Sequence, residues 1–377
     1  MNETATPLQP EPGIAVHRLR IAFFSDSLAE RNGTGSYYHD LIDQLRSRVE
    51  CVEILQPEAS NGFHPFRFPL PGDATQHVAA PNPVRIHRTL ARLQPHVIVS
   101  VTPGPYGLLG PWMARRHQCG FISAYHTHFE GLADLYWRPF KRQLISGCLS
   151  SANRFLCQRS STVLIHNQAL DDTVMGLGAR QCDVMGTPLA RNFAETPPAP
   201  LTEGLQQVCF AGRLAAEKNI DTILEAARHW PSIRFVIGGD GPLKSRVEAA
   251  ASELPNLDYR GWLSRDALRQ LIDDSSLLVL PSHQETFGSI ALEAMARGRP
   301  ALVSENIGIH DWPQLANGLC KIHHGETLSD AIGRLQASPP GFLTEVASRA
   351  REAALQLNDD TLEQWLDVLT AQATARP

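Results

Sequence analysis

The chain has 377 residues and a mass of 41.5 kDa, which exceeds one ordinary domain and fits two domains of the usual size. Hydrophobic residues make up 43% and charged residues 19%, so the composition excludes a collagenous, coiled-coil or disordered chain. The net charge of −5 divides into +2 before residue 190 and −7 after it, an asymmetry too small to suggest the strongly basic stripe that nucleic-acid binding requires.

The sequence contains no run of about 18 uncharged apolar residues, and residues 1–12 lack the basic start and apolar core of a signal peptide. We therefore expect a cytoplasmic protein that does not span a membrane. Seven cysteines are scattered and form no Cys-x-x-Cys pair, so the sequence indicates neither a disulfide framework nor a structural zinc site.

From residue 20 onward, short β-branched or aromatic runs alternate with longer amphipathic stretches, the pattern of strands and crossover helices in a parallel sheet. The expected strands of the first series are residues 19–24, 52–55, 96–101, 120–125, 162–166 and 182–185. The expected helices between them include residues 36–48, 84–93 and 138–158.

A linker follows, because residues 187–202 contain four prolines and no apolar period. A second alternating series comes next, with strands at 207–211, 234–237, 257–260, 277–280 and 301–304 and helices at 221–229, 243–254, 265–273 and 289–297. Two such sheets leave a cleft between them, and open parallel sheets bind ligands beyond the carboxyl ends of their strands. The predicted organisation is a first domain over 1–190, a linker over 191–202, a second domain over 203–360 and a helix over 361–377 that crosses back to the first domain.

The most informative segment is residues 280–299, LPSHQETFGSIALEAMARGR, where an apolar strand gives way to a polar loop and then to a helix. Glu285 lies in the loop, and Glu293 lies eight positions later in the helix. The start of a helix near Gly288 suits a phosphate or sugar oxygen, and carboxylates accept hydrogen bonds from vicinal hydroxyls. The segment predicts a site for a sugar nucleotide, and the alternative is a helix with Glu293 on a solvated face.

This arrangement resembles the Glu, seven residues, Glu motif of retaining glycosyltransferases with two Rossmann-like domains, the GT4 family of the GT-B fold class. The resemblance implies an α/β fold of two Rossmann-like, doubly wound parallel-sheet domains that face each other across a cleft. It implies that Glu285 binds donor-sugar hydroxyls near the anomeric centre and that Glu293 binds the ribose hydroxyls. It also places Phe287 and Gly288 in the donor site.

A second segment, residues 210–220 (FAGRLAAEKNI), resembles the strand-end segment of this family whose Arg and Lys clamp the donor diphosphate. The resemblance assigns that role to Arg213 and Lys218. Because fixed cations neutralise the charge of a leaving diphosphate without a metal ion, we expect a metal-independent reaction with no cofactor. The alternative is that these two residues are surface charges at the start of a helix.

The turn at 238–242 (GGDGP) lacks the spacing of G-x-G-x-x-G, which disfavours a dinucleotide-binding dehydrogenase. It resembles the Gly-rich turn of the family, so Gly239 and Gly241 are expected to let the backbone approach the donor phosphates, with a plain tight turn as the alternative. Residues 259–263 (YRGWL) correspond to the segment that lines the nucleobase pocket, which puts Trp262 in the donor site.

In the first domain, residues 32–35 (NGTG) open a helix after the first strand. The resemblance implies that the amides of Gly33 and Gly35 face the diphosphate across the cleft, whereas helix capping is the simpler explanation. The family commonly has Gly-Gly here, so Thr34 is a departure from its pattern.

Residues 125–128 (YHTH) end the fourth strand at the carboxyl edge of the sheet. The His-x-His pattern suits a metal pair, but the sequence places no third ligand beside it. The resemblance identifies His126 as the active-site histidine beside the donor sugar and puts Thr127, His128 and Tyr136 on the acceptor side. A histidine held in structural hydrogen bonds is the alternative.

Five positive charges and no acidic residue occur in residues 138–159: Arg138, Lys141, Arg142, Arg154 and Arg159. Basic residues interleaved with Trp, Phe and Leu are typical of a surface that rests on anionic lipid. The region also resembles the Tyr-His-Thr region of diacylglycerol glycosyltransferases and sulfoquinovosyl transferases. We expect Arg138, Lys141 and Arg142 to contact the membrane, and a solvated basic helix face is the alternative.

Together these features predict a retaining glycosyltransferase that moves a sugar from a nucleotide-diphosphate sugar, with UDP-sugars favoured, to a lipid hydroxyl such as that of diacylglycerol. The expected partners are the nucleotide sugar, the lipid acceptor and the anionic inner face of the membrane. The alternatives are a transferase with a soluble or polysaccharide acceptor and a non-catalytic sugar-nucleotide or lipid-binding protein of the same fold. A PLP-dependent phosphorylase needs a Schiff-base lysine, and none of the four lysines lies in a recognisable cofactor segment.

Overall fold

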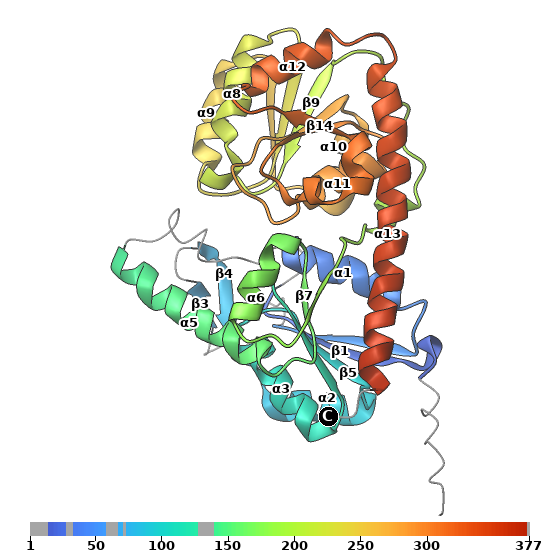
Figure 1. The fold of residues 1–377 in the computed structure, drawn as a ribbon. Helices are drawn as coiled ribbons and strands as arrows, with labels where there is room; N and C mark the ends of the chain where they lie inside the picture. Colours follow the sequence, from blue (N-terminus) through green and yellow to red (C-terminus); the bar gives the residue numbers. More distant parts are fainter. Residues whose placement is uncertain (1–13, 28–32, 58–66, 71–72, 127–138, 375–377) are drawn as a thin grey trace, which may run out of the picture.

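Two parallel sheets, one after the other along the chain, form the cores of two domains (Figure 1). The structure is a computed structural model that describes residues 14–27, 33–57, 67–70, 73–126 and 139–374. Helices pack against both sheets, so the architecture is the doubly wound, two-domain α/β fold that the sequence predicts.

The first sheet has the strand order β2-β1-β5-β6-β7-β8 and is parallel throughout. Its strands are β1 (Arg20–Phe24), β2 (Cys51–Leu55), β5 (Val97–Ser100), β6 (Gly120–Ala124), β7 (Val163–Ile165) and β8 (Cys182–Val184). The helices of this half are η1 (Val16–Arg18), α1 (Gly33–Leu45), α2 (Pro83–Leu93), α3 (Pro105–His117), α5 (Pro139–Cys157), η2 (Gln168–Leu170) and α6 (Asp171–Gly176). All six expected strands are confirmed to within one residue at each end.

Several elements of the first half were not predicted, among them a hairpin and helix α3. An antiparallel hairpin joins β3 (Arg67–Leu70) to β4 (Asp73–Ala79), outside the main sheet. Pro69 within β3 hides the strand from pattern analysis, because proline argues against a strand interior. Helix α3 escaped prediction for a similar reason, since Pro111 lies inside it.

The second sheet has the order β11-β10-β9-β12-β13-β14, which is the Rossmann strand order. Its strands are β9 (Gln207–Ala211), β10 (Arg234–Gly238), β11 (Leu257–Gly261), β12 (Leu277–Leu280), β13 (Ala301–Ser304) and β14 (Leu319–Ile322). Its helices are η3 (Ala216–Lys218), α8 (Ile220–His229), α9 (Lys244–Glu253), α10 (Arg265–Asp273), α11 (Ser289–Ala296), η4 (Gly308–Asp311), η5 (Pro313–Gly318) and α12 (Leu328–Gln336). The order reverses between β9 and β12, so the switch point where such sheets bind ligands lies between these two strands.

The last helix, α13 (Phe342–Thr374), runs alongside both domains (Figure 1). Near its start, Val346 and Ala350 are buried in the core of the second domain. Near its end, Trp365 and Leu369 are buried in the core of the first domain. Because one continuous helix contributes to both cores, it ties the two domains together along one side.

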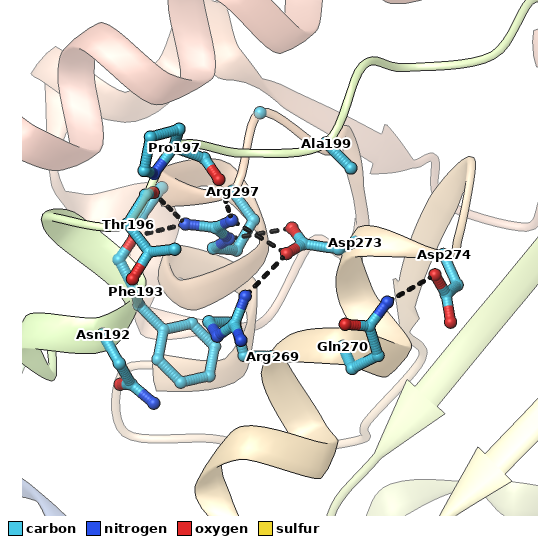
Figure 2. Close-up of polar contacts among 12 residues, drawn as sticks. Asn192, Phe193, Thr196, Pro197, Ala199, Arg269, Gln270, Asp273, Asp274 and Arg297 are labelled. Atoms are coloured by element: carbon cyan, nitrogen blue, oxygen red, sulfur yellow. Dashed lines mark hydrogen bonds and ion pairs between the residues drawn. The ribbon is translucent and has the colours of Figure 1, made fainter.

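Buried arginines hold the segment between the domains, which includes the short helix α7 (Arg191–Ala194). Arg297 is fully buried, donates to Asp273 at 2.8 Å and binds the carbonyls of Thr196 at 2.5 Å and Pro197 at 2.9 Å (Figure 2). Arg299 donates to the carbonyl of Ala199 at 3.0 Å. The linker is therefore fixed to the second domain by charge-assisted bonds to its backbone.

Candidate active site

The ends of β9 and β12 carry two of the predicted catalytic residues and bring them into contact. Lys218 closes η3, which follows β9, and Glu285 lies in the loop after β12. Lys218 Nζ and Glu285 Oε1 form an ion pair, with the two side chains 18% and 16% exposed. The pair therefore lies at the switch point of the second sheet, where the fold positions ligands.

The loop that carries Glu285 is fixed on both sides. Ser282 Oγ donates to Glu285 Oε1 at 3.1 Å, and the amide of Gly308 donates to the Glu285 carbonyl at 3.2 Å. Gly288 has a φ of +96°, and a Cβ at this position would lie 2.9 Å from the side chain of Ile307. Glycine is required here, and α11 begins at the next residue.

Arg213 lies between β9 and η3, beside the Gly-rich turn after β10. Its Nη1 is 3.8 Å from Oε1 of the buried Glu217. Gly239 has a φ of +133°, and a Cβ there would lie 1.8 Å from the carbonyl oxygen of Gly212. Close backbone packing therefore explains this glycine, and the approach of Gly239 and Gly241 to donor phosphates stays a prediction.

Glu293 projects from α11 and is only 8% exposed, so the alternative of a solvated helix face is wrong. Its Oε1 accepts a hydrogen bond from Arg265 Nη1 at 2.6 Å. Burial raises the pKa of Glu293, and the ion pair with Arg265 opposes that rise. The N-cap Ser264, whose side chain accepts from the Ala267 amide, makes Arg265 the first residue of α10.

His126 follows β6 and belongs to an aromatic cluster at the same edge of the first sheet. Tyr38 Oη and His126 Nε2 are 2.6 Å apart, and the rings of His126 and His166 are centred 4.4 Å apart. Burial lowers the pKa of His166 to about 4, and burial together with His166 lowers the pKa of His126 well below its ordinary value. Both histidines are therefore uncharged at neutral pH.

The aromatic cluster is completed from α13. Trp365 Nε1 donates to Tyr37 Oη at 2.9 Å, and Tyr37 Oη donates to the carbonyl of Gly186 at 2.9 Å. The rings of Tyr37 and His166 are centred 4.7 Å apart. The helix that ties the domains together thus also packs against the environment of His126.

The two domains meet directly at the predicted catalytic residues. Thr286 Oγ1, next to Glu285, donates to the backbone carbonyl of His126 at 3.3 Å. Helix α1, which begins with Gly33 and buries Gly35, lies on the side of the first domain nearest the second (Figure 1). The loop that carries Glu285 therefore meets the segment of His126 at the junction of the two domains.

Several predicted residues are placed differently or are not described. Trp262, directly after β11, is 56% exposed. Phe287 is buried, with its ring centred 6.1 Å from that of Trp312, so a donor contact at this position would come from the backbone. Residues outside the described part of the chain are Thr127, His128, Tyr136 and Arg138, and the side chains of Lys141 and Arg142 in α5 are also outside it.

Sequence reasoning missed three residues of this junction: Tyr38, His166 and Arg265. His166 ends an expected strand next to the one that precedes His126, so two histidines at neighbouring strand ends were a usable signal. Arg265 starts an expected helix at the carboxyl edge of the second sheet. No sequence feature singled out Tyr38, because an aromatic residue on an amphipathic helix is usually a core residue.

Two absences hold for the part of the chain that the structure describes. None of its helices is long and apolar enough to cross a bilayer. None of its His, Cys, Asp and Glu side chains gather in groups of three or more that could hold a metal ion.

The fold defines the class of protein. Similar solved structures include HepE from Anabaena in complex with UDP and glucose, with a TM-score of 0.65 and 16% sequence identity. The match covers 92% of this chain and 99% of that one. Two Rossmann-like domains with this arrangement make the chain a GT-B fold protein.

The sequence comparison then identifies the family. The model of glycosyl transferases group 1 matches residues 194–353, and the model of glycosyltransferase family 4 matches residues 31–185. The chain belongs to the GT4-type glycosyltransferases of the GT-B fold.

Two curated relatives show how far the similarity extends. A GDP-mannose-dependent alpha-(1-6)-phosphatidylinositol dimannoside mannosyltransferase of Mycobacterium tuberculosis is 32% identical over 37% of this chain and 38% of that protein. The sulfoquinovosyl transferase SQD2 of Arabidopsis thaliana is 26% identical over 60% of this chain and 46% of that protein. The chain thus spans less than half the length of these two relatives.

Proposed function

We propose that this protein transfers a sugar from a nucleotide-diphosphate sugar to a hydroxyl group with retention at the anomeric carbon. The observation that carries the proposal is the hydrogen bond from Thr286 to the His126 carbonyl. It joins the strand-end loops of the two domains beside the pair of Lys218 and Glu285, so groups for the sugar and for the diphosphate meet at one place.

The donor roles follow from charge. Arg213 and Lys218 bind the diphosphate and stabilise the negative charge that develops as it leaves, an effect typically worth about 3 to 4 kcal/mol per donor group. Glu285 accepts hydrogen bonds from sugar hydroxyls, and Glu293 accepts them from the ribose. Because Lys218 pairs with Glu285, a positive and a negative side chain adjoin, which supports a site for a donor whose diphosphate and sugar adjoin.

The proposed reaction is a front-face substitution. The bond between the anomeric carbon and the phosphate oxygen breaks, and its electron pair stays with the phosphate. The acceptor oxygen bonds to the same face of that carbon, and its proton passes to the departing phosphate oxygen. His126 is uncharged, so it acts as a hydrogen-bonding group beside the sugar and not as a cation.

We propose a membrane lipid such as diacylglycerol as acceptor, reached from the cytoplasmic face by peripheral binding. Arg154 near the C-terminal end of α5 and Arg159, two residues beyond that end, are exposed, and α5 extends away from α13 (Figure 1). Trp112 on α3 is 54% exposed, with the guanidinium of Arg116 5.9 Å from its ring centre. Cations beside exposed aromatic rings support contact with anionic lipid.

The names of similar proteins support the proposal and define the donors to test. The mycobacterial relative is named for a phosphatidylinositol dimannoside acceptor and GDP-mannose, and the HepE structure holds UDP. UDP-sugars remain our first choice of donor. The test is incubation with a membrane lipid extract and a panel of UDP- and GDP-sugars, with products of both the lipid and water phases read by mass spectrometry.

The same incubation separates the alternatives. A glycolipid whose new linkage has the anomeric configuration of the donor supports the proposal. A water-soluble product shifts the acceptor to a soluble glycoside or polysaccharide. Nucleotide binding without transfer from any donor indicates a non-catalytic binding protein. A parallel incubation with EDTA tests whether the reaction is independent of metal ions. Activity that is lost with EDTA and restored by Mg²⁺ or Mn²⁺ would contradict metal independence.

A further inference from the structure

Three charged side chains, Asp40, Arg265 and Glu293, form two consecutive ion pairs across the junction of the two domains. Arg265 Nη1 donates to Glu293 Oε1 at 2.6 Å, and Arg265 Nη2 donates to Asp40 Oδ2 at 2.6 Å. The Asp40 and Glu293 side chains are 8% and 10% exposed. One guanidinium thus bridges two buried carboxylates through two different nitrogen atoms.

The three residues come from different elements. Asp40 lies on α1 in the first domain, whereas Arg265 and Glu293 lie on α10 and α11 in the second. The Arg265 guanidinium also lies 5.0 Å from the ring centre of Phe193 in α7. Because the Arg265 guanidinium is planar and contacts Glu293, Asp40 and Phe193, its orientation is fixed by residues of both domains.

The arrangement leaves part of Glu293 available. Its contact with Arg265 uses Oε1, and within the described residues Oε2 makes no hydrogen bond. Burial favours the protonated acid, which accepts fewer hydrogen bonds than the carboxylate, and Arg265 opposes this protonation. Arg265 therefore favours the ionised carboxylate of Glu293 and fixes the position of its Oε1.

We propose that Arg265 and Asp40 are positioning residues for ribose recognition: Arg265 orients the Glu293 carboxylate, and Asp40 holds Arg265 from the other domain. This inference rests on the proposed binding of a nucleotide ribose by Glu293. The inference goes beyond ribose binding by Glu293, because recognition of the ribose hydroxyls then depends on Asp40, a residue of the acceptor-side domain. The contact between the two domains and the selection of a ribonucleotide are thereby coupled.

A second ion pair on α1 supplies a matched control. Arg191 Nε and Asp43 Oδ2 are 3.0 Å apart, with side chains 39% and 42% exposed. This pair also joins α1 to another element, α7, but neither residue contacts Glu293. The substitution Asp43→Asn therefore removes a comparable charge from the same helix without affecting the proposed ribose site.

The experiment measures calorimetric affinities for UDP and GDP and for their 2′,3′-dideoxy forms, which lack the ribose hydroxyls. We expect the wild type to prefer the ribonucleotide that it binds over its dideoxy form. Arg265→Gln reduces that preference about tenfold, the scale of one hydrogen bond to a charged group, and leaves the dideoxy affinity unchanged. Arg265→Lys retains part of the preference, Asp40→Asn reduces it, and Asp43→Asn keeps it at the wild-type value.

The outcomes distinguish this inference from the proposed function. If the wild type binds neither nucleotide or shows no ribose preference, the proposed donor site itself is wrong. If the wild type prefers the ribonucleotide and either Asp40→Asn or Arg265→Gln keeps that preference in full, the positioning role is overturned. Equal losses for ribo and dideoxy forms also overturn it. An unchanged dideoxy affinity shows that the variant has folded with its pocket intact.

Discussion

The two domains hold their parts of the junction by different physical means. In the second domain, neighbouring motifs supply opposite charges that pair directly, as Lys218 does with Glu285. In the first domain, His126 is held by uncharged rings, and its partner Tyr38 lies 88 positions away in the chain. Substitutions in the second domain should therefore act through unbalanced charge, and those in the first through lost orientation.

The largest expected effect concerns the charged framework of the second domain. Arg297→Ala leaves Asp273 without its fully buried partner and frees three carbonyls of the linker. Breaking a buried pair from one side typically costs about 3 to 5 kcal/mol of unfolding free energy. Urea denaturation measures the loss, and Arg349→Ala, which breaks an exposed pair with Glu345, should cost less than about 1 kcal/mol.

The next largest effect is expected from removing the positive charges at the switch point of the second sheet. Arg213→Ala and Lys218→Ala should each lower turnover by a factor on the order of 10² or more, because each removes a cation that stabilises the leaving diphosphate. Steady-state kinetics with a saturating donor measures the change. Lys244→Ala is the matched control, since Lys244 lies in the same domain in an exposed pair with Glu248. Wild-type turnover in either clamp variant would remove that residue from the site.

A third prediction separates the surface of the first domain from the donor site of the second. Lys141→Glu combined with Arg142→Glu should weaken binding to anionic vesicles, because each near-surface charge is worth about 1 kcal/mol, screened over about 8 Å at physiological salt. Donor affinity should stay unchanged. Co-sedimentation at two salt concentrations measures the effect, with Lys244→Glu and Arg246→Glu on α9 as a control of equal charge change. Equal sedimentation of both double variants would favour a soluble acceptor.

The contrast between the domains also explains what could be predicted from the sequence. The pair of Lys218 and Glu285 was predictable in outline, because each residue follows a strand end within a short motif and parallel strand ends share one edge. The contact of Asp40 with Arg265 was not predictable, since it depends on how the two domains face each other. The contact of Tyr38 with His126 was also not predictable, because it depends on how α1 is oriented about its own axis.

The smallest expected effect concerns the orientation of His126. Tyr38 is fully buried, and burial raises the pKa of its hydroxyl, so the group stays protonated beside Nε2 of the uncharged His126. We predict that this hydroxyl donates to Nε2, which places the imidazole proton on Nδ1. Tyr38→Phe removes this single hydrogen bond. The activation free energy should rise by about 1 kcal/mol, which lowers turnover roughly fivefold, with little change in the KM for the donor.

Tyr37→Phe is the control that distinguishes orientation from stability. Its hydroxyl bonds Gly186 and Trp365 but not His126, so its loss should lower the melting temperature while turnover stays near the wild-type value. Nitrogen NMR of labelled histidine supplies a second readout: Nε2 of His126 should be an acceptor in the wild type, and both tautomers should be present in Tyr38→Phe. Equal loss of turnover in the two variants would mean that the ring cluster acts through packing alone, and the uncharged domain would then contribute rigidity to the junction without controlling the tautomer.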